Sequence, residues 1–362
     1  MPSLAEYGWT TERETGFAAD AATGLVPGRV VSQAREVTRA ITAAGPTDVF
    51  IQRGFRRTAA GTADFPAVGD WLALEPMFDR SGAALRAVLP RTSAFMRGQA
   101  DGGGRLHEQV LAANVDHVFL VAALTRDYNL RRIERYLALA WSSGAAPVIV
   151  LNKVDICDNV EERMAEVTDI AGEAPIHAVS ARTHAGLDAL DRYLEPGRTV
   201  ALLGSSGVGK STITNALLGE ERQLVRETRG DDERGRHTTT GRELFVLPSG
   251  ALLIDTPGLR SIGLLDTESG LGSAFDDIEA LALTCRFSDC GHGTEPGCAV
   301  NAAIDAGELA PQRLASRQKM EREIRSVERR QSAPASREAS RRFSREVRHV
   351  TRTRSRMQGR ED

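Results

Sequence analysis

The sequence predicts an α/β protein of three consecutive parts: a small β-barrel, a doubly wound parallel sheet, and a helical, basic, metal-binding end. Three observations predict this organisation. Five short strand-like segments come before residue 97, strand and helix patterns alternate from residue 116 onward, and three of the four cysteines lie close together near the C-terminal end. At 362 residues the chain is long enough for two or three domains.

We expect the first part, residues 28–100, to form an OB-fold that binds RNA. The segment before it, residues 1–27, is expected to be flexible. The strand-like segments of the first part are "GRVVSQ", "REVTRAITA", "TDVFIQRG", "DWLALEP" and "AALRAVLP", separated by Gly, Pro and Asp turns and without a helical period. Five strands in about seventy residues suit a small barrel of this kind. The RNA-binding role rests on the fold alone, because the segment is not rich in aromatic residues.

The second part, residues 101–270, predicts a parallel sheet with helices on both faces. Apolar strands such as "DHVFLVAAL", "APVIVLN", "PIHAVSA" and "TVALLG" alternate with the helical segments "NLRRIERYLALAWSSG", "NVEERMAEVTDIAG" and "GLDALDRYLE". After one more helix, "GRELFVLPSGALLIDTPG" is typical of a hairpin of two strands.

A phosphate-binding loop lies between the strand "TVALL" and the helix "STITNALL". The stretch "GSSGVGKST" satisfies G-x-x-x-x-G-K-[ST], so its backbone N–H groups can point at phosphate oxygens. We expect Lys210 to neutralise β- and γ-phosphate charge and the Ser211 hydroxyl to bind Mg²⁺. The expected loop residues are Gly204, Ser205, Ser206, Gly207, Val208, Gly209, Lys210, Ser211 and Thr212.

Two further strand ends predict specificity for guanine. The NKxD sequence Asn152, Lys153, Val154 and Asp155 follows the strand "PVIVL", and the Asp155 carboxylate can accept from guanine N1–H and N2–H₂ together. One βα unit later, "VSAR" contains Ser180 and Ala181. We expect Asn152 and Lys153 to brace the loop and the Ala181 N–H to meet guanine O6.

The DTPG sequence predicts the remaining contacts with Mg²⁺ and the γ-phosphate. Asp255 ends a strand and can hold Mg²⁺, usually through water, while the Gly258 N–H can reach the γ-phosphate. Many small GTPases have a Gln after this motif to orient the attacking water. Leu259 occupies that position here, so intrinsic hydrolysis should be slow.

The charged segment before the hairpin contains "RHTTT" and lies where a switch loop belongs. We expect Thr239 to bind Mg²⁺, with Thr238 and Thr240 as alternatives. His237 can position the attacking water or can be a solvent-exposed histidine of the switch, and the sequence leaves both interpretations open. The predicted catalytic residues are therefore His237, Thr239 and Lys210.

The order of these motifs is unusual, because NKxD and SAR come before the phosphate loop rather than after it. Cutting the usual fold in the loop after DTPG and joining the old ends leaves the sheet and the site unchanged. Such a circular permutation is physically allowed, since chain termini lie at the surface and are often close together.

The third part, residues 271–330, contains Cys285-x₄-Cys290-x-His292-x₅-Cys298. Three thiolates and one imidazole form a closed tetrahedral set for a structural Zn²⁺. The alternative is three unrelated buried cysteines beside a surface histidine. Cys157 lies outside the cluster and is expected to serve packing only.

Charge is distributed unevenly along the chain. Residues 311–362 contain 16 Lys and Arg against 7 Asp and Glu, whereas the whole chain has a net charge of −3. A basic end, including the Arg-rich tail 331–362, suggests a polyanionic partner, although a solvated tail would have the same composition. No secretory signal or membrane-spanning run is apparent and the cysteines are few, so we expect a cytoplasmic protein.

Together these motifs resemble one known family. "FPAVGDWLAL", "RTSAFMR", "QVLAANVDHVFLV", NKVD, SAR, "GSSGVGKST", "RHTTT", DTPG and the Cys/His cluster, in this order, are similar to the circularly permuted GTPases of ribosome small-subunit assembly, the RsgA or YjeQ type. The resemblance covers about residues 28–315. It implies an OB domain, a permuted GTPase, one zinc ion, Mg²⁺ with GTP, a monomer, and binding to 16S rRNA in a late 30S precursor that stimulates hydrolysis.

Two functions therefore follow from the sequence. The first is a GTP hydrolase that acts on the maturing small subunit. The second is a GTP-gated RNA-binding or chaperone module whose own hydrolysis is incidental, which the missing Gln favours and the complete set of Mg²⁺ ligands disfavours. A metal-delivery GTPase is disfavoured because four protein ligands leave the metal no exchangeable position.

Overall fold

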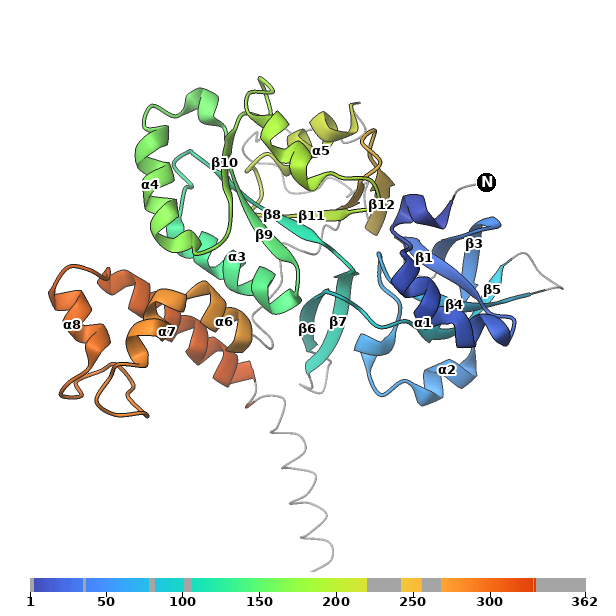
Figure 1. Ribbon diagram of the computed structural model, residues 1–362, viewed down its shortest axis with the longest axis horizontal. Coiled ribbons are helices and arrows are strands. Elements are labelled where there is room, and N and C mark those ends of the chain that lie inside the picture. The colour runs from blue at the N-terminus through green and yellow to red at the C-terminus, as the bar shows by residue number, and fades with distance from the viewer. Residues whose placement is uncertain are drawn as a thin grey trace, which may run out of the picture.

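The computed structural model describes residues 3–34, 37–77, 82–100, 106–219, 242–255, 268–327 and 329. One sheet of eleven strands runs through the first two parts of the chain in the order β10-β9-β8-β11-β13-β12-β1-β2-β3-β5-β4 (Figure 1). Its last five strands close into a barrel through an additional pairing of β1 with β4. The barrel is thus continuous with the nucleotide-binding sheet through the antiparallel pairing of β1 with β12.

The barrel confirms the predicted OB-fold. Its strands are β1 (Val26–Gln33), β2 (Thr38–Thr42), β3 (Gly45–Phe50), β4 (Trp71–Pro76) and β5 (Ala83–Val88). They close in the order β1-β2-β3-β5-β4-β1, with β3 and β5 parallel. A short helix, α2 (Arg53–Thr58), and the 3₁₀ helix η2 (Thr62–Asp64) connect β3 to β4.

The segment before the barrel is ordered where we expected a flexible one. It forms the 3₁₀ helix η1 (Leu4–Tyr7) and α1 (Thr11–Ala22), which lie against the barrel in Figure 1. The Phe17 ring is buried, and the Trp9 and Trp71 ring centroids are 4.7 Å apart. Three aromatic rings therefore hold this segment in place, because burying such large side chains offsets the entropy lost on ordering it.

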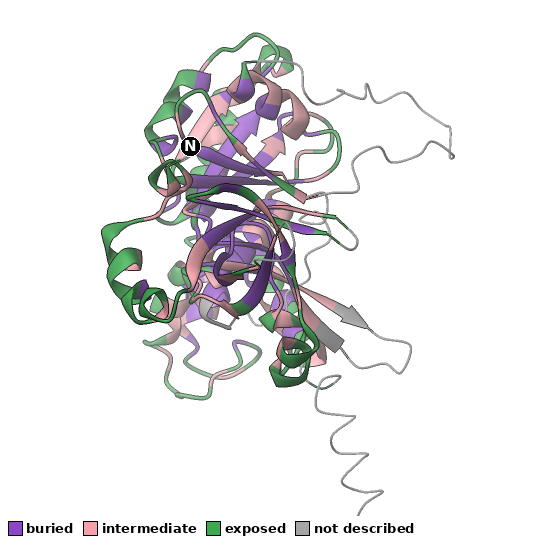
Figure 2. Cartoon of the chain, turned by 90° about the vertical axis from the view of Figure 1, so that its right-hand side faces the viewer, coloured by how far each residue is buried: buried purple, intermediate pink, exposed green. Residues whose placement is uncertain are grey.

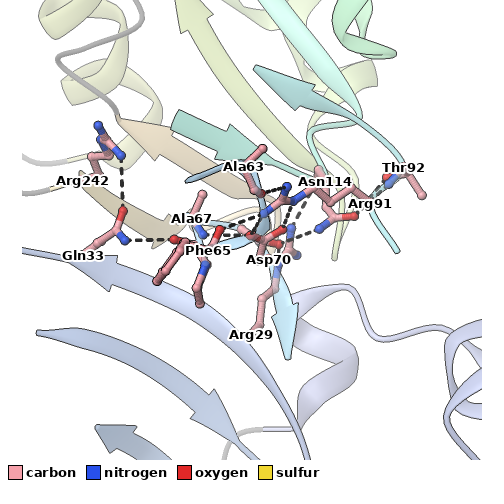
Figure 3. Close-up of polar contacts among 12 residues, drawn as sticks. Arg29, Gln33, Ala63, Phe65, Ala67, Asp70, Arg91, Thr92, Asn114 and Arg242 are labelled. Atoms are coloured by element: carbon pink, nitrogen blue, oxygen red, sulfur yellow. Dashed lines mark hydrogen bonds and ion pairs between the residues drawn. The ribbon is translucent and has the colours of Figure 1, made fainter. Parts of the chain in front are cut away.

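A buried polar cluster joins η1, the barrel and the nucleotide-binding domain, and Figure 3 shows its residues Arg29, Asp70, Arg91 and Asn114. Arg91 donates from Nε and Nη2 to the two oxygens of Asp70, at 2.8 and 2.7 Å. The Arg29 guanidinium donates to the Tyr7 and Asn114 carbonyls and, at 2.8 Å, to Thr199 Oγ1. Burial raises the pKa of Asp70 and lowers the pKa of Arg29 to about 9. The cluster ties the start of the nucleotide-binding sheet to the barrel.

The nucleotide-binding sheet has the predicted parallel arrangement. Its parallel strands are β8 (His117–Ala123), β9 (Ala146–Asn152), β10 (Ile176–Val179), β11 (Thr199–Leu203) and β13 (Leu252–Asp255), with β12 (Arg242–Val246) antiparallel to β13 as the predicted hairpin. Successive side chains of each strand enter two different cores. Figure 2 shows that buried residues concentrate along the strands.

Helices cover both faces of this sheet (Figure 1). One face packs on α3 (Leu130–Ser143) and α4 (Val160–Ala171), and the other on α5 (Lys210–Leu218) and η4 (Leu187–Tyr193). The segment 186–195, predicted as an α-helix, is the 3₁₀ helix η4, which buries Leu187, Leu190 and Tyr193. A separate two-stranded ribbon of β6 (Ala94–Ala100) and β7 (Leu106–Ala113) was not among the predicted elements.

The C-terminal part is helical. It contains α6 (Glu268–Ala274), α7 (Asp276–Ala282), α8 (Ala299–Asp305) and a further helix over residues 311–327. These helices lie beside α3 and away from the barrel (Figure 1). Among the described residues, no helix combines the length and the apolar character that crossing a membrane requires.

Candidate nucleotide site and metal centre

The phosphate loop connects β11 to α5, as the sequence predicted. Gly207 and Gly209 have φ angles of 79° and 101°, a region that favours glycine because it lacks a Cβ. A Cβ on Gly204 would lie 2.4 Å from the Val121 carbonyl oxygen, so the loop can leave the sheet this closely only with glycine there. The N-terminus of α5 follows directly, with Ser211 and Thr212 half-buried in its first turn.

Lys210 is held across the start of this loop. Its ammonium donates to the Gly204 carbonyl at 2.6 Å and to the Ser205 carbonyl at 2.5 Å. The remaining loop residues differ in exposure, since Val208 is buried whereas Ser206 and Gly207 are exposed. The loop thus keeps the positive charge of Lys210 beside its curled backbone, which suits an anionic ligand.

Asn152 binds both neighbouring loops. It is only 2% exposed, its Nδ2 donates to the Val208 carbonyl at 2.9 Å, and its Oδ1 accepts from the Ala181 N–H at 3.0 Å. A Cβ on Gly209 would lie 2.2 Å from Asn152 Nδ2. One amide side chain therefore connects the phosphate loop, NKxD and SAR by hydrogen bonds. The Ala181 N–H, which we expected to meet guanine O6, already donates to this amide.

The other NKxD residues reach the same loops. Lys153 has a positive φ of 69°, and its Nζ donates to the Gly207 carbonyl at 2.8 Å. Asp155 is exposed in the 3₁₀ helix η3 (Val154–Ile156), and its Oδ1 accepts from the buried Ser180 hydroxyl at 2.7 Å. Ser180 thus orients an accessible carboxylate at the end of β9.

The site also involves a residue that the sequence analysis missed. The Tyr136 hydroxyl, from α3, lies 3.2 Å from the Ser205 hydroxyl of the phosphate loop. No motif marks this tyrosine, and helical periodicity alone cannot show which residue meets a loop about seventy positions later. Asp255 ends β13 as predicted, whereas Gly258, His237 and Thr239, with Thr238 and Thr240, lie outside the described residues.

The predicted Cys/His cluster comes together as a metal site. One ligand atom each from Cys285, Cys290, His292 and Cys298 lies within 4.8 Å of the other three. The His292 Nδ1 is 3.7 Å from Cys285 Sγ and 3.5 Å from Cys298 Sγ, and these two sulfurs are 4.0 Å apart. Zn–S bonds of about 2.3 Å in a tetrahedron place sulfurs about 3.8 Å apart. The four side chains therefore fit a tetrahedral metal ion.

The chain around the cluster is held by its own hydrogen bonds. The Glu295 carboxylate accepts from the Gly291 N–H at 3.1 Å and from the Gly293 N–H at 2.6 Å. Cys298 also caps α8, because its Sγ accepts from the Asn301 N–H. Cys157 lies away from the cluster, with its thiol 3.4 Å from Asn159 Oδ1.

The parallel sheet, the phosphate loop and the guanine-type loops at the same strand ends define a P-loop GTPase. Its motif order, with NKxD before the phosphate loop, makes it circularly permuted. The family model described as RsgA GTPase matches residues 88–265. The chain is also 42% identical over 322 residues to "Small ribosomal subunit biogenesis GTPase RsgA 2" of Lactiplantibacillus plantarum, covering 89% of each chain. It therefore belongs to the RsgA family and is a GTP hydrolase.

Other relatives agree with this assignment. The RsgA protein of Methanosarcina acetivorans is 44% identical over 88% of this chain and 84% of its own length. The crystal structure of YjeQ from Thermotoga maritima covers 83% of this chain and 98% of its own, with 27% identity and a TM-score of 0.61. A structure of YloQ, described as a circularly permuted GTPase, shares the fold with a TM-score of 0.58 at 21% identity.

Proposed function

We propose that this GTPase acts in late maturation of the 30S ribosomal subunit, where it binds 16S rRNA and the particle stimulates its hydrolysis of GTP. The observation that carries the proposal is the near-complete coverage of relatives named as small ribosomal subunit biogenesis GTPases. We further propose that it works in the cytoplasm as a monomer.

Guanine is read by the exposed Asp155 carboxylate. Ser180 holds one carboxylate oxygen, which orients the group toward the N1–H and N2–H₂ edge of the base. The Lys153 stem covers the base, and its ammonium stays on the phosphate loop. The contact from the Ala181 N–H to guanine O6 is then a shared one, because Asn152 Oδ1 accepts from the same N–H.

Phosphate chemistry takes place at the start of α5. Lys210 neutralises the β- and γ-phosphates, the loop N–H groups hold their oxygens, and Gly258 contacts the γ-phosphate. Ser211, Asp255 and Thr239 are the proposed ligands of Mg²⁺, which stabilises charge that develops during phosphoryl transfer. His237 orients the attacking water, since Leu259 cannot.

The Cys₃His cluster holds one structural Zn²⁺. With four protein ligands the metal has no open position for substrate, so its contribution is to stabilise the fold of the C-terminal region. The ligands Cys285, Cys290, His292 and Cys298 keep the loop between α7 and α8 in a single conformation.

Hydrolysis measured with and without purified 30S subunits tests the proposal. We expect the particle to accelerate GTP hydrolysis by the wild-type protein. His237→Ala should lower that stimulated rate by about 100-fold, as loss of a water-positioning group does, while the affinity for GTP changes less than about twofold.

A second outcome would favour the alternative function. If 30S subunits bind the protein in a GTP-dependent way but do not change its hydrolysis rate, the protein is a GTP-gated RNA-binding or chaperone module. Equal stimulated rates for the wild type and His237→Ala would show that the histidine does not take part in hydrolysis. Another group would then orient the attacking water when the particle binds.

A further inference from the structure

Helix α3 lies between the nucleotide-binding sheet and the C-terminal helices (Figure 1). Its residues Glu134 and Tyr136 are two positions apart, so their side chains leave the helix about 200° apart. Glu134 meets the C-terminal helices, whereas Tyr136 meets the phosphate loop. The two opposite sides of one helix thus contact two functional regions.

On the side of the phosphate loop, Tyr136 contacts Ser205, whose carbonyl also accepts a hydrogen bond from Lys210. The Tyr136 hydroxyl is 3.2 Å from the Ser205 hydroxyl, and the Ser205 carbonyl accepts from the Lys210 ammonium at 2.5 Å. Ser205 is therefore held through its side chain by α3 and through its backbone by the lysine. A shift of Ser205 would therefore move one of the carbonyls that bind the Lys210 ammonium.

On the opposite side, α3 is joined to the C-terminal helices by a buried ion pair. Arg313 Nη1 is 3.2 Å from Glu134 Oε1, and the two side chains are only 5% and 0% exposed. Arg313 also donates to both oxygens of Asp277 in α7. A second pair, Arg135 with Glu323 at 2.7 Å, joins α3 to the helix over residues 311–327.

Backbone packing makes this connection rigid. A Cβ on Gly270 of α6 would lie 2.4 Å from the Ala138 carbonyl oxygen and 2.6 Å from the Ser142 N. The backbones of α3 and α6 therefore approach closely, with no side chain of residue 270 between them. A movement of α3 is passed directly to α6, because no flexible group can absorb it.

We propose that Tyr136 is a positioning residue for the phosphate loop, and that α3 couples this contact to the C-terminal helical region. The proposal rests on the proposed role of Lys210 at the phosphates. Nucleotide that displaces Ser205 changes the Tyr136 contact, and α3 transmits the change to α6 and to the helix over residues 311–327. By thermodynamic reciprocity, a partner that moves those helices alters the phosphate loop.

A double-mutant cycle on the full-length protein tests the contact. Tyr136→Phe and Ser205→Ala each remove one hydroxyl of the pair, and each should lower kcat for GTP hydrolysis about 2- to 10-fold with KM nearly unchanged. The double variant should be no slower than the slower single variant, because both substitutions remove the same interaction. Effects that multiply would overturn the proposal.

Hydrogen exchange tests the coupling to the C-terminal region. GDP should change the exchange of residues 311–327 in the wild type, and Tyr136→Phe should reduce that change by at least half. Tyr193→Phe is the matched control, because it removes a 2.8 Å contact with His177 Nε2 in the core that packs on η4 and α5. An exchange response in Tyr136→Phe equal to that of the control would contradict the coupling.

A Lys210→Met variant separates this inference from the proposed function. If Lys210→Met hydrolyses GTP at the normal rate, the lysine does not act on the phosphates, and both proposals fail. An inactive Lys210→Met, together with multiplying effects of Tyr136→Phe and Ser205→Ala, would remove only the role of Tyr136.

Discussion

The nucleotide site and the C-terminal helical region are stabilised in different ways. The nucleotide site is built from strand ends above two large apolar cores, and single buried side chains such as Asn152 connect its loops. The C-terminal region has no described strand, and its labelled helices α6, α7 and α8 have seven residues each. Helices this short are not stable alone, so they depend on the apolar core that they share with α3 and the sheet, and the buried ion pairs and the Cys/His cluster add to this packing.

The difference teaches that the two regions can be perturbed separately, except where α3 joins them. Damage to the cluster should leave nucleotide affinity unchanged, and damage to Asn152 should leave the cluster intact. Four comparisons of variants test this division, in order of decreasing expected effect.

Replacing a metal ligand should have the largest effect. Cys298→Ser removes a buried sulfur that also caps α8, so we expect loss of the proposed metal and unfolding of residues 285–305, with GTP affinity within about twofold of wild type. Metal content and hydrogen exchange measure this. Cys157→Ser, outside the cluster, is the control and should retain the metal.

Breaking the buried ion pair should have the next largest effect. Arg313→Met removes an ion partner of Asp277 and of the fully buried Glu134, which among the described residues keeps Arg131, and should lower the free energy of unfolding by about 3 kcal/mol. Chemical denaturation measures it. Arg317→Met removes pairs with the half-buried Glu279 and with Glu321 and should cost less than about 1 kcal/mol. Equal costs for the two variants would show that burial of the ion pairs of Arg313 is unimportant.

Removing the amide that connects the nucleotide loops should act on binding. Asn152→Ala leaves the Val208 carbonyl and the Ala181 N–H without that partner, and we expect about 10- to 100-fold weaker GDP binding. Calorimetry measures the affinity. Asn159→Ala is the control, since this exposed side chain donates to Glu162 and accepts from the Cys157 thiol. A Kd for Asn152→Ala within twofold of that of the control would contradict the assigned connection.

Two glycines of α6 give the smallest and most specific comparison. Gly270→Ala should destabilise the protein by about 1–3 kcal/mol, because its Cβ would collide with the α3 backbone. Gly272→Ala has open space around its Cβ and should stabilise by about 0.5–1 kcal/mol through helix propensity. Thermal unfolding measures both. The same sign for both substitutions would mean that α3 and α6 do not pack backbone to backbone.

Much of the fold could be predicted because its signals are local. The strand pattern located all five barrel strands and the parallel strands of the nucleotide-binding sheet, and the glycines of "GSSGVGKST" located the phosphate loop. The Cys/His spacing predicted which four side chains come together for the same reason, since a short loop can bring them within reach of one ion.

The errors arose where packing overrode local preference. Residues 187–193 have a helical pattern but form a 3₁₀ helix that buries Leu187, Leu190 and Tyr193 against the sheet. Residues 11–22 have no strong apolar face, yet they are ordered because the aromatic rings of Trp9 and Phe17 pack near Trp71. The partner of the Ala181 N–H was likewise decided by a side chain twenty-nine positions away.

The sequence by itself determined which chemistry is present: a phosphate loop, guanine-type loops, a metal cluster and their permuted order. These follow from residue types at short spacing, where chain geometry alone constrains the outcome. Only the tertiary structure decided how the parts are connected, through the pairing of β1 with β12, the Arg29 and Asp70 cluster, and the two sides of α3. Such contacts join residues far apart in the chain, and their partners are set by the packing of the whole molecule.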